Sequence, residues 1–275
     1  MVTLLVAPTD EKRASGDETR GDDFTSTQDW SVWDEYFTSN ADSVREREWH
    51  IDWGADVELS RREENRWVES WRTFHASTSI DGRRIPTALE VQRAGYVSSV
   101  SALLAERRRH TRLARMLLAR FDADTPLRAG GSTSGSLSRR GLKHLGVLGV
   151  LCAWAVTSAV AAVYYGWAQS AAPDPVIRAV ASCLLPDVSG HARFVESVLV
   201  EAFADRSALQ AGVWSLLWAL LAVVAALSMG WRHAAVLVGR GGSRVQVAVR
   251  TWQAVNGARR STMKQAAHHR RKFLD

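Results

Sequence analysis

The chain has 275 residues, of which 46% are hydrophobic, and its 35 Lys and Arg oppose 29 Asp and Glu for a formal net charge of +6. Two cysteines are too few for a disulfide framework or a cysteine-rich zinc site within one chain. The positive charge does not by itself indicate nucleic-acid binding, because residues 1–82 are strongly acidic and the basic excess lies further along the chain.

Residues 1–26 are polar and acidic with little apolar content, which predicts a disordered acidic N-terminus. The apolar stretch in residues 1–8 is too short for a cleavable signal peptide and lacks the basic start. The acidic residues between Asp10 and Glu18 are unusual for a mitochondrial presequence. We therefore expect the first long apolar run to act as its own membrane-insertion signal.

Six of the 12 tryptophans fall within residues 27–78, in pairs spaced three or four residues apart. That spacing places each pair on one face of a helix and predicts two or three short amphipathic helices. The favoured interpretation is that these rings form the core of a small helical domain, and the alternative is a partner-binding surface, where tryptophan is enriched. The residues concerned are Trp30, Trp33, Trp49, Trp53, Trp67 and Trp71.

Residues 87–121 have a helical pattern whose second half is strongly basic, and they end a Trp-rich helical domain expected over residues 27–128. A basic amphipathic helix near a bilayer indicates contact with anionic lipid headgroups. Pairing with the acidic Trp-rich region, a nucleic-acid contact and a simple solvated face are the alternatives. The candidate lipid-contact residues, with three from the basic tail, are Arg107, Arg108, Arg109, Arg112, Arg115, Arg270, Arg271 and Lys272.

Two apolar runs without a charged residue, Leu145–Trp167 and Ala211–Trp231, follow a Gly/Ser-rich basic linker at residues 129–143. Each exceeds the roughly 20 residues that a helix needs to cross a bilayer, and aromatic residues lie at their ends. The sequence therefore predicts an all-α membrane protein with a hairpin of two transmembrane helices, residues 144–167 and 211–231. The alternative, two core helices of a soluble domain, is disfavoured because the remaining chain offers little apolar material to cover both.

Small residues recur at four-residue spacing in both runs, which lets helix backbones approach closely in lipid. We expect the two helices to pack on each other through Ala155, Ala159, Ala222, Ala226 and Gly230.

The flanks of the predicted hairpin differ in charge. Residues 83–143 hold 13 basic and 4 acidic residues, the tail at 232–275 holds 10 and 1, and the connecting residues 168–211 hold 3 and 5. Basic flanks stay on the cytosolic or matrix-equivalent side, so both termini are expected there. The loop at 168–210 is expected to contain an amphipathic helix near residues 189–205. An organelle membrane, of the endoplasmic reticulum, peroxisome or mitochondrion, is favoured over the plasma membrane.

No known catalytic, metal-binding or nucleotide-binding motif occurs, so we expect no enzyme activity, no cofactor and no metal. The alternative is an enzyme whose active site is assembled from residues that are scattered along the sequence. The leading hypothesis is a scaffold, tether or accessory subunit with lipid and protein partners and no nucleic acid. The alternatives are a membrane-shaping hairpin protein and an accessory subunit of a mitochondrial inner-membrane complex.

Overall fold

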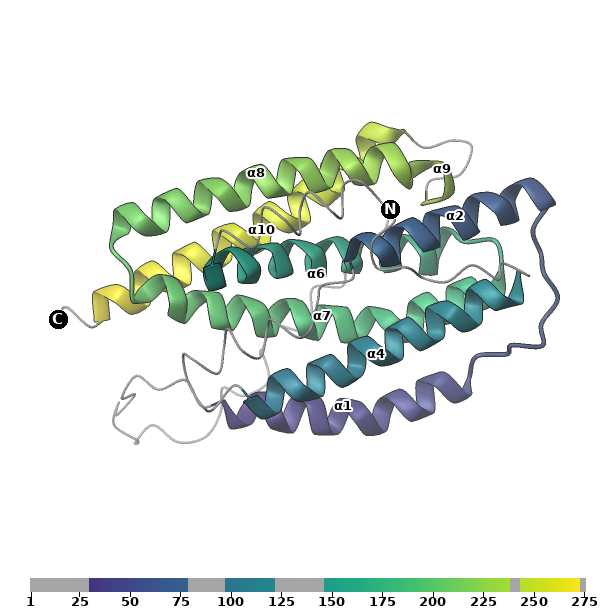
Figure 1. Cartoon of the computed structure of the whole chain (residues 1–275), viewed down its shortest axis with the longest axis horizontal. Helices are drawn as coiled ribbons and strands as arrows, with labels where there is room; N and C mark the ends of the chain where they lie inside the picture. The colour runs from purple at the N-terminus through teal and green to yellow at the C-terminus, as the bar shows by residue number, and fades with distance from the viewer. Residues whose placement is uncertain (1–29, 79–96, 122–145, 238–242, 273–275) are drawn as a thin grey trace, which may run out of the picture.

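The computed structural model describes residues 30–78, 97–121, 146–237 and 243–272, and their regular secondary structure is entirely helical. The predicted disordered N-terminus and the linker at 129–143 lie outside these residues. The helices, drawn in Figure 1, are α1 (Ser31–Trp49), α2 (Arg61–Thr78), α4 (Val97–Arg120), α6 (Gly146–Ala171), α7 (Pro175–Ala204), α8 (Ala208–Arg232), α9 (Ala234–Leu237) and α10 (Arg244–Lys272).

Local sequence signals explain where several helices begin. Asp174 caps α7 by accepting a hydrogen bond from the Ile177 amide at 3.0 Å, and Pro175 follows at the first helical position. Ser207 and Gln210 form a reciprocal capping box at the start of α8. These caps satisfy backbone groups that the first turn of a helix leaves without intrahelical partners.

Four helices, α6, α7, α8 and α10, form a bundle in which each successive helix runs back along the previous one, as Figure 1 shows. Helix α6 packs mainly on α7, and α8 packs mainly on α10. Helices α1 and α4 lie together against α7, and α2 lies beside α6 and α9. The three N-terminal helices therefore pack directly on the bundle, α1 and α4 through α7 and α2 through α6.

The two apolar helices run in the same direction. Tyr164, late in α6, and His233, just after α8, have ring centroids 5.4 Å apart, so the same ends of the two helices meet. A hairpin of two spans joined by a loop requires antiparallel helices, and here the 30-residue helix α7 makes the return path. Helix α7 is much longer than the predicted amphipathic helix, and it fills most of the segment predicted as a loop. The two-span hairpin is thus not confirmed, whereas the presence of two helices long and apolar enough to cross a membrane is.

Aromatic rings fill much of the core between the helices. Phe74 of α2 stacks on Tyr164 of α6 with ring centroids 3.9 Å apart. Phe194 of α7 makes T-shaped contacts with rings from α1 and α6, including Trp33 at 5.3 Å and Trp154 at 6.4 Å between centroids. The N-terminal helices are therefore joined to the bundle by continuous ring packing.

Candidate functional site

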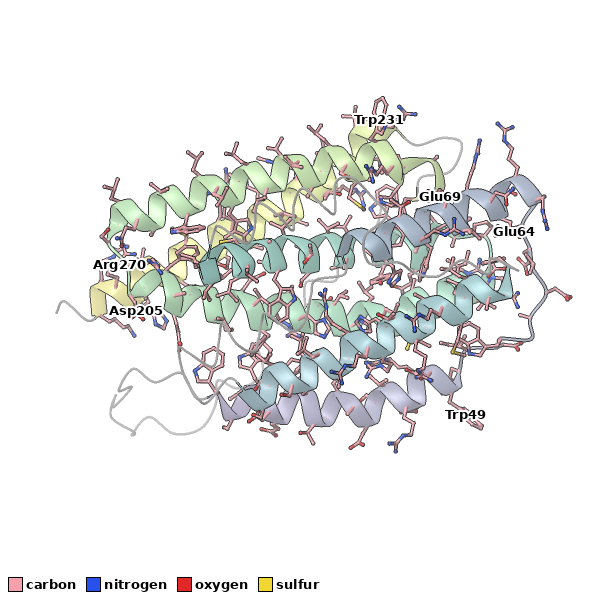
Figure 2. The ribbon with its side chains drawn as sticks, viewed as in Figure 1. Trp49, Glu64, Glu69, Asp205, Trp231 and Arg270 are labelled. Carbon is pink, nitrogen blue, oxygen red and sulfur yellow. The ribbon has the colours of Figure 1, made fainter. Side chains whose placement is uncertain are left out.

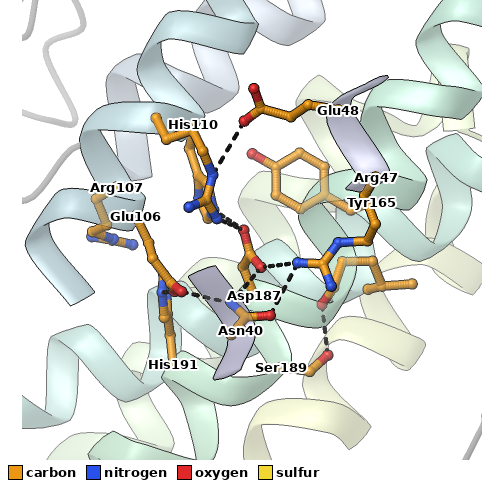
Figure 3. Close-up of polar contacts among 12 residues, drawn as sticks. Asn40, Arg47, Glu48, Glu106, Arg107, His110, Tyr165, Asp187, Ser189 and His191 are labelled. Carbon is orange, nitrogen blue, oxygen red and sulfur yellow. Dashed lines mark hydrogen bonds and ion pairs between the residues drawn. The ribbon is translucent and has the colours of Figure 1, made fainter. Parts of the chain in front are cut away.

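The most polar part of the interior lies where α1, α4 and α7 meet. Helix α4 carries Glu106 and His110, and α7 carries Asp187 and His191, so each helix presents a carboxylate and an imidazole four residues apart on one face. The two pairs cross, because His110 contacts Asp187 and His191 contacts Glu106. Figure 3 shows these four side chains together with Asn40 of α1 at the centre of the cluster.

Asp187 is the hub of this cluster and has no exposed surface. Its carboxylate accepts hydrogen bonds from Asn40 at 2.9 Å, Arg47 at 2.7 Å and His110 at 2.8 Å, and Arg109 completes the set. Burial alone would raise the pKa of Asp187, but the hydrogen bonds from His110 and Asn40 and the positive charge of Arg109 hold its pKa well below the usual range. The carboxylate is therefore ionised, and its desolvation is offset by several donors.

Asn40 joins the two carboxylates. Its amide nitrogen donates to Glu106 at 2.6 Å and to Asp187 at 2.9 Å, while its oxygen accepts from Arg47 at 3.0 Å. Both donors and one acceptor position of this amide are thus used to join three helices. Burial, followed by the negative charge of Asp187, raises the pKa of Glu106.

The two histidines are neutral at physiological pH. Burial lowers the pKa of His191 to about 3 and that of His110 to about 4, the latter in spite of its contact with Asp187. A neutral imidazole facing a carboxylate places its proton on the contacting nitrogen, so Nε2 donates in both residues. The two rings stack with centroids 5.4 Å apart. The Nδ1 atom of His191 is buried without a hydrogen-bond partner among the described residues.

Helix α1 approaches this site very closely at Gly190. A Cβ atom built on Gly190 would lie 1.9 Å from the hydroxyl oxygen of Tyr36. The ring of Tyr36 therefore occupies space that any other residue at position 190 would fill. The glycine lets α1 dock against α7 beside Asp187 and His191.

The arrangement is suited to holding helices together rather than to binding a metal. With both histidines neutral, the negative charges of Asp187 and Glu48 are met by the guanidinium group of Arg109, which contacts both carboxylates, and by Arg47 and Arg112. Positively charged guanidinium groups in direct contact with these carboxylates disfavour the binding of a metal cation there. Among the described residues, no group of three or more His, Cys, Asp or Glu side chains is placed to hold a metal ion.

The predicted tryptophan set divides by burial. Trp67 and Trp71 are buried in the core, and Trp30, Trp33 and Trp53 are partly buried against it. Trp49 is 88% exposed and points away from the end of α1 in Figure 2. This distribution supports the core interpretation for most of the set and leaves Trp49 as the member free to meet a partner.

The predicted lipid-contact arginines of α4 also divide. Arg109 and Arg112 pair with Glu48, and Arg109 also contacts Asp187, so their charges are used within the molecule. Arg108 and Arg115 are exposed. In the tail, Arg270 donates to the carbonyl oxygen of Phe203 at 2.8 Å, and Arg271 and Lys272 are exposed.

The five predicted helix-packing residues are all buried: Ala155, Ala159, Ala222, Ala226 and Gly230. Gly230 packs against α10 rather than α6, since a Cβ atom there would lie 2.6 Å from the Arg244 carbonyl oxygen.

Sequence reasoning missed the Asp187 cluster. The available signal was the pair of carboxylate-x-x-x-histidine spacings in α4 and α7, which matches no common metal motif. Comparison with known proteins adds no further assignment: no protein-family model, no curated protein and no solved structure matches the chain.

Proposed function

We propose that the chain is a membrane-anchored helical scaffold, tether or accessory subunit of a membrane complex, and that the outer face of α8 is its lipid contact. The observation that carries this proposal is a continuous apolar stripe on the outside of the bundle. Its residues recur at three- and four-residue spacing along one helix face. They are Leu209, Val213, Leu216, Leu220, Val223, Val224, Leu227 and Trp231, all exposed.

Lipid is the occupant that best fits this face. The apolar stripe runs along the whole of this 25-residue helix, over about 37 Å. Its only charged residue is Arg232 at the C-terminal end, next to Trp231. The guanidinium group of Arg244 lies 4.7 Å from the Trp231 ring centroid, so aromatic and basic groups meet where the apolar face ends. Such groups favour the headgroup region.

Helix α6 is more deeply buried in the bundle than α8. Of its most apolar stretch, 56% is buried inside the bundle, against 22% for α8. Packing against α7, α8 and α10 accounts for the hydrophobicity of much of α6 without lipid. The proposal therefore assigns the membrane contact to α8, and it does not require a two-span hairpin.

The scaffold part of the proposal concerns the N-terminal helices. Helices α1 and α4 lie on the opposite side of the bundle from α8 (Figure 1). Their sequences contain many charged residues. The exposed ring of Trp49 adds a large aromatic contact on this side. The basic segments of the sequence favour the cytosolic side of an organelle membrane for this surface.

A second candidate, membrane shaping, is favoured by the one-sided character of the same stripe. A helix that inserts only its outer face expands one leaflet and bends the bilayer. Electron microscopy of vesicles with the purified chain distinguishes the two candidates, because a scaffold leaves vesicles round and a shaping protein produces tubules.

The anchor is tested by flotation of the full chain with phosphatidylcholine vesicles after detergent removal. The wild-type chain is expected to float, and Leu216→Lys with Leu220→Lys should reduce vesicle binding at least tenfold, because a lysine in hydrocarbon costs about 2.5–3.5 kcal/mol. The matched control changes two exposed valines elsewhere, Val32→Lys with Val57→Lys, and should float normally. A wild-type chain that stays unbound as a discrete dimer would assign the stripe to a second copy and overturn the anchor.

The scaffold part needs a separate measurement. A photo-crosslinking amino acid in place of Trp49 is expected to capture a small, reproducible set of protein neighbours in native membranes. The same probe in place of Val32 is the control for random collision. Equal capture at both positions would contradict a partner contact at the end of α1.

A further inference from the structure

A second surface feature lies at the end of the apolar stripe. A groove of about 540 Å³ runs between α2 and the corner formed by α8 and α9. Seven of its nine lining residues have polar or charged side chains, and these include three exposed arginines from two separate helices. The lining residues are Arg62, Asn65, Arg66, Glu69, Ser70, Thr73, Arg232, Ala235 and Val236.

The groove has unneutralised positive charge. Within the described part of the chain, no ion pair involves Arg62, Arg66 or Arg232. The one carboxylate in the lining, Glu69, pairs with Arg72 at 3.2 Å, so it does not neutralise them. Guanidinium groups bind phosphate through parallel hydrogen bonds, and three around one groove favour an anion that carries phosphate.

The floor of the groove is held in place. The Ser70 hydroxyl contacts the Tyr164 hydroxyl at 3.1 Å and Nδ1 of His233 at 2.9 Å, which joins α2 to α6 and to the end of α8. All three residues are buried. The position of α2 relative to α8, and therefore the separation of the arginines on the two helices, is fixed by this contact and by the stacking of Phe74 on Tyr164.

Position along the molecule selects among phosphate-bearing ligands. Arg232 is the residue after Trp231, which is 74% exposed and ends the apolar stripe of α8. Figure 2 shows Trp231 at the end of α8 and Glu69 on the neighbouring stretch of α2. A phospholipid combines these two features, because its anionic headgroup lies at the edge of the apolar hydrocarbon. A soluble phosphate compound has no part that would use the stripe.

We infer that the groove between α2 and the α8–α9 corner binds the headgroup of an anionic phospholipid in the membrane that the outer face of α8 contacts. This inference rests on the proposed lipid contact of α8. It adds a chemical preference to that contact: the bundle binds anionic bilayers better than neutral ones, and the arginines of the groove are responsible.

The test compares vesicles of phosphatidylcholine alone with vesicles that contain phosphatidylglycerol, at physiological salt. The variant Arg62→Gln, Arg66→Gln, Arg232→Gln removes three positive charges from exposed positions and leaves the core unchanged. The matched control, Arg45→Gln, Arg260→Gln, Lys264→Gln, removes the same charge from exposed positions on α1 and α10. Circular dichroism confirms that each variant keeps its helices.

The wild-type chain is expected to prefer anionic vesicles at least tenfold, since each arginine near an anionic surface adds about fivefold in affinity before screening. The groove variant should lose that preference and still bind neutral vesicles through α8, and the control should keep it. Equal loss in both variants would show that net charge, not the groove, gives the preference, and would overturn the inference.

Two further outcomes separate this inference from its premise. A wild-type chain that binds neither kind of vesicle would refute the lipid contact of α8 itself, whereas equal binding to both kinds would refute only the groove. Titration of inorganic phosphate into the full chain in detergent tests whether the groove binds a soluble ligand instead. Tight phosphate binding that depends on the three arginines, with no vesicle preference, would assign the groove to a soluble phosphate compound and overturn the lipid assignment.

Discussion

Replacing Asp187 with asparagine tests whether the buried cluster holds α1 and α4 to the bundle. The change keeps the shape of the side chain and removes its charge. The wild-type carboxylate accepts four hydrogen bonds, two of them from the guanidinium groups of Arg47 and Arg109. In the variant, one carbonyl oxygen remains as an acceptor, and the new amide nitrogen faces donors.

The expected cost follows from the burial of each partner. Breaking a buried ion pair on one side usually costs 3–5 kcal/mol, because the remaining charge is left without compensation. The side chains of Arg47 and Arg109 are 26% and 16% exposed, so water can partly compensate them. We therefore expect Asp187→Asn to lower the free energy of unfolding by about 3 kcal/mol, at the low end of that range.

Equilibrium unfolding in urea, followed by tryptophan fluorescence in a fixed detergent, measures this loss. Asp42→Asn removes an exposed carboxylate from α1 and serves as the control, with an expected change within about 0.5 kcal/mol. A double-mutant cycle with Arg47→Met should give a coupling of about 1 kcal/mol or more. If Asp187→Asn costs no more than the control, the cluster does not hold the helices and the reasoning fails.

Three other predictions use the same unfolding assay. Trp71→Ala should lower the free energy of unfolding by about 3–5 kcal/mol because the residue is 1% exposed, whereas Trp49→Ala should change it little. Equal losses would contradict the interpretation of these rings as core. Gly190→Ala should destabilise the wild-type chain by about 1–3 kcal/mol, because the added methyl group clashes with Tyr36. In a Tyr36→Ala chain, the same change should stabilise the fold by up to about 1 kcal/mol, because alanine favours a helix more than glycine does. Destabilisation in both backgrounds would exclude the clash as the cause. The free energy of unfolding should fall as pH drops from about 6.5 towards 4, because buried His191 stays neutral in the folded chain while the same residue in the unfolded chain takes up a proton. His191→Gln should make this dependence on pH less steep. An unchanged pH dependence would refute the assignment of the effect to His191.

Sequence periodicity predicted the helical elements well where each one has its own apolar or aromatic pattern. The limits of α6 and α8 lie within a few residues of the predicted spans, apart from the extension of α6 to Ala171. Helix α10 was not anticipated, because a strongly basic tail is typical of a surface segment. In the structure, Val247, Val255 and Ala266 supply a buried stripe against α8 and the rest of the bundle.

The direction of the helices could not be read from composition. A stretch with charged residues between two uncharged apolar runs is typical of a loop, and α7 contains charged residues throughout. Those charges do not prevent burial, because Asp187 finds donors on α1 and α4 and Arg178 donates to the Ala172 carbonyl oxygen at 2.8 Å. The partners of Asp187 lie between 77 and 147 residues away in the chain, so no local pattern reveals them. Only tertiary packing turns these residues into a site.

The two kinds of contact in the molecule have different consequences for a membrane anchor. Helices α6, α7, α8 and α10 are joined largely through apolar surface, which detergent or lipid can replace. The face of α7 that carries Asp187 is joined to α1 and α4 by ionised groups, and no apolar environment can replace those partners. Lipid can therefore cover the outer face of α8, but it cannot cover this face of α7 unless the N-terminal helices remain docked. The Asp187 cluster thus fixes which side of the bundle is available to the membrane, and it ties the polar helices to the anchor as one folding unit.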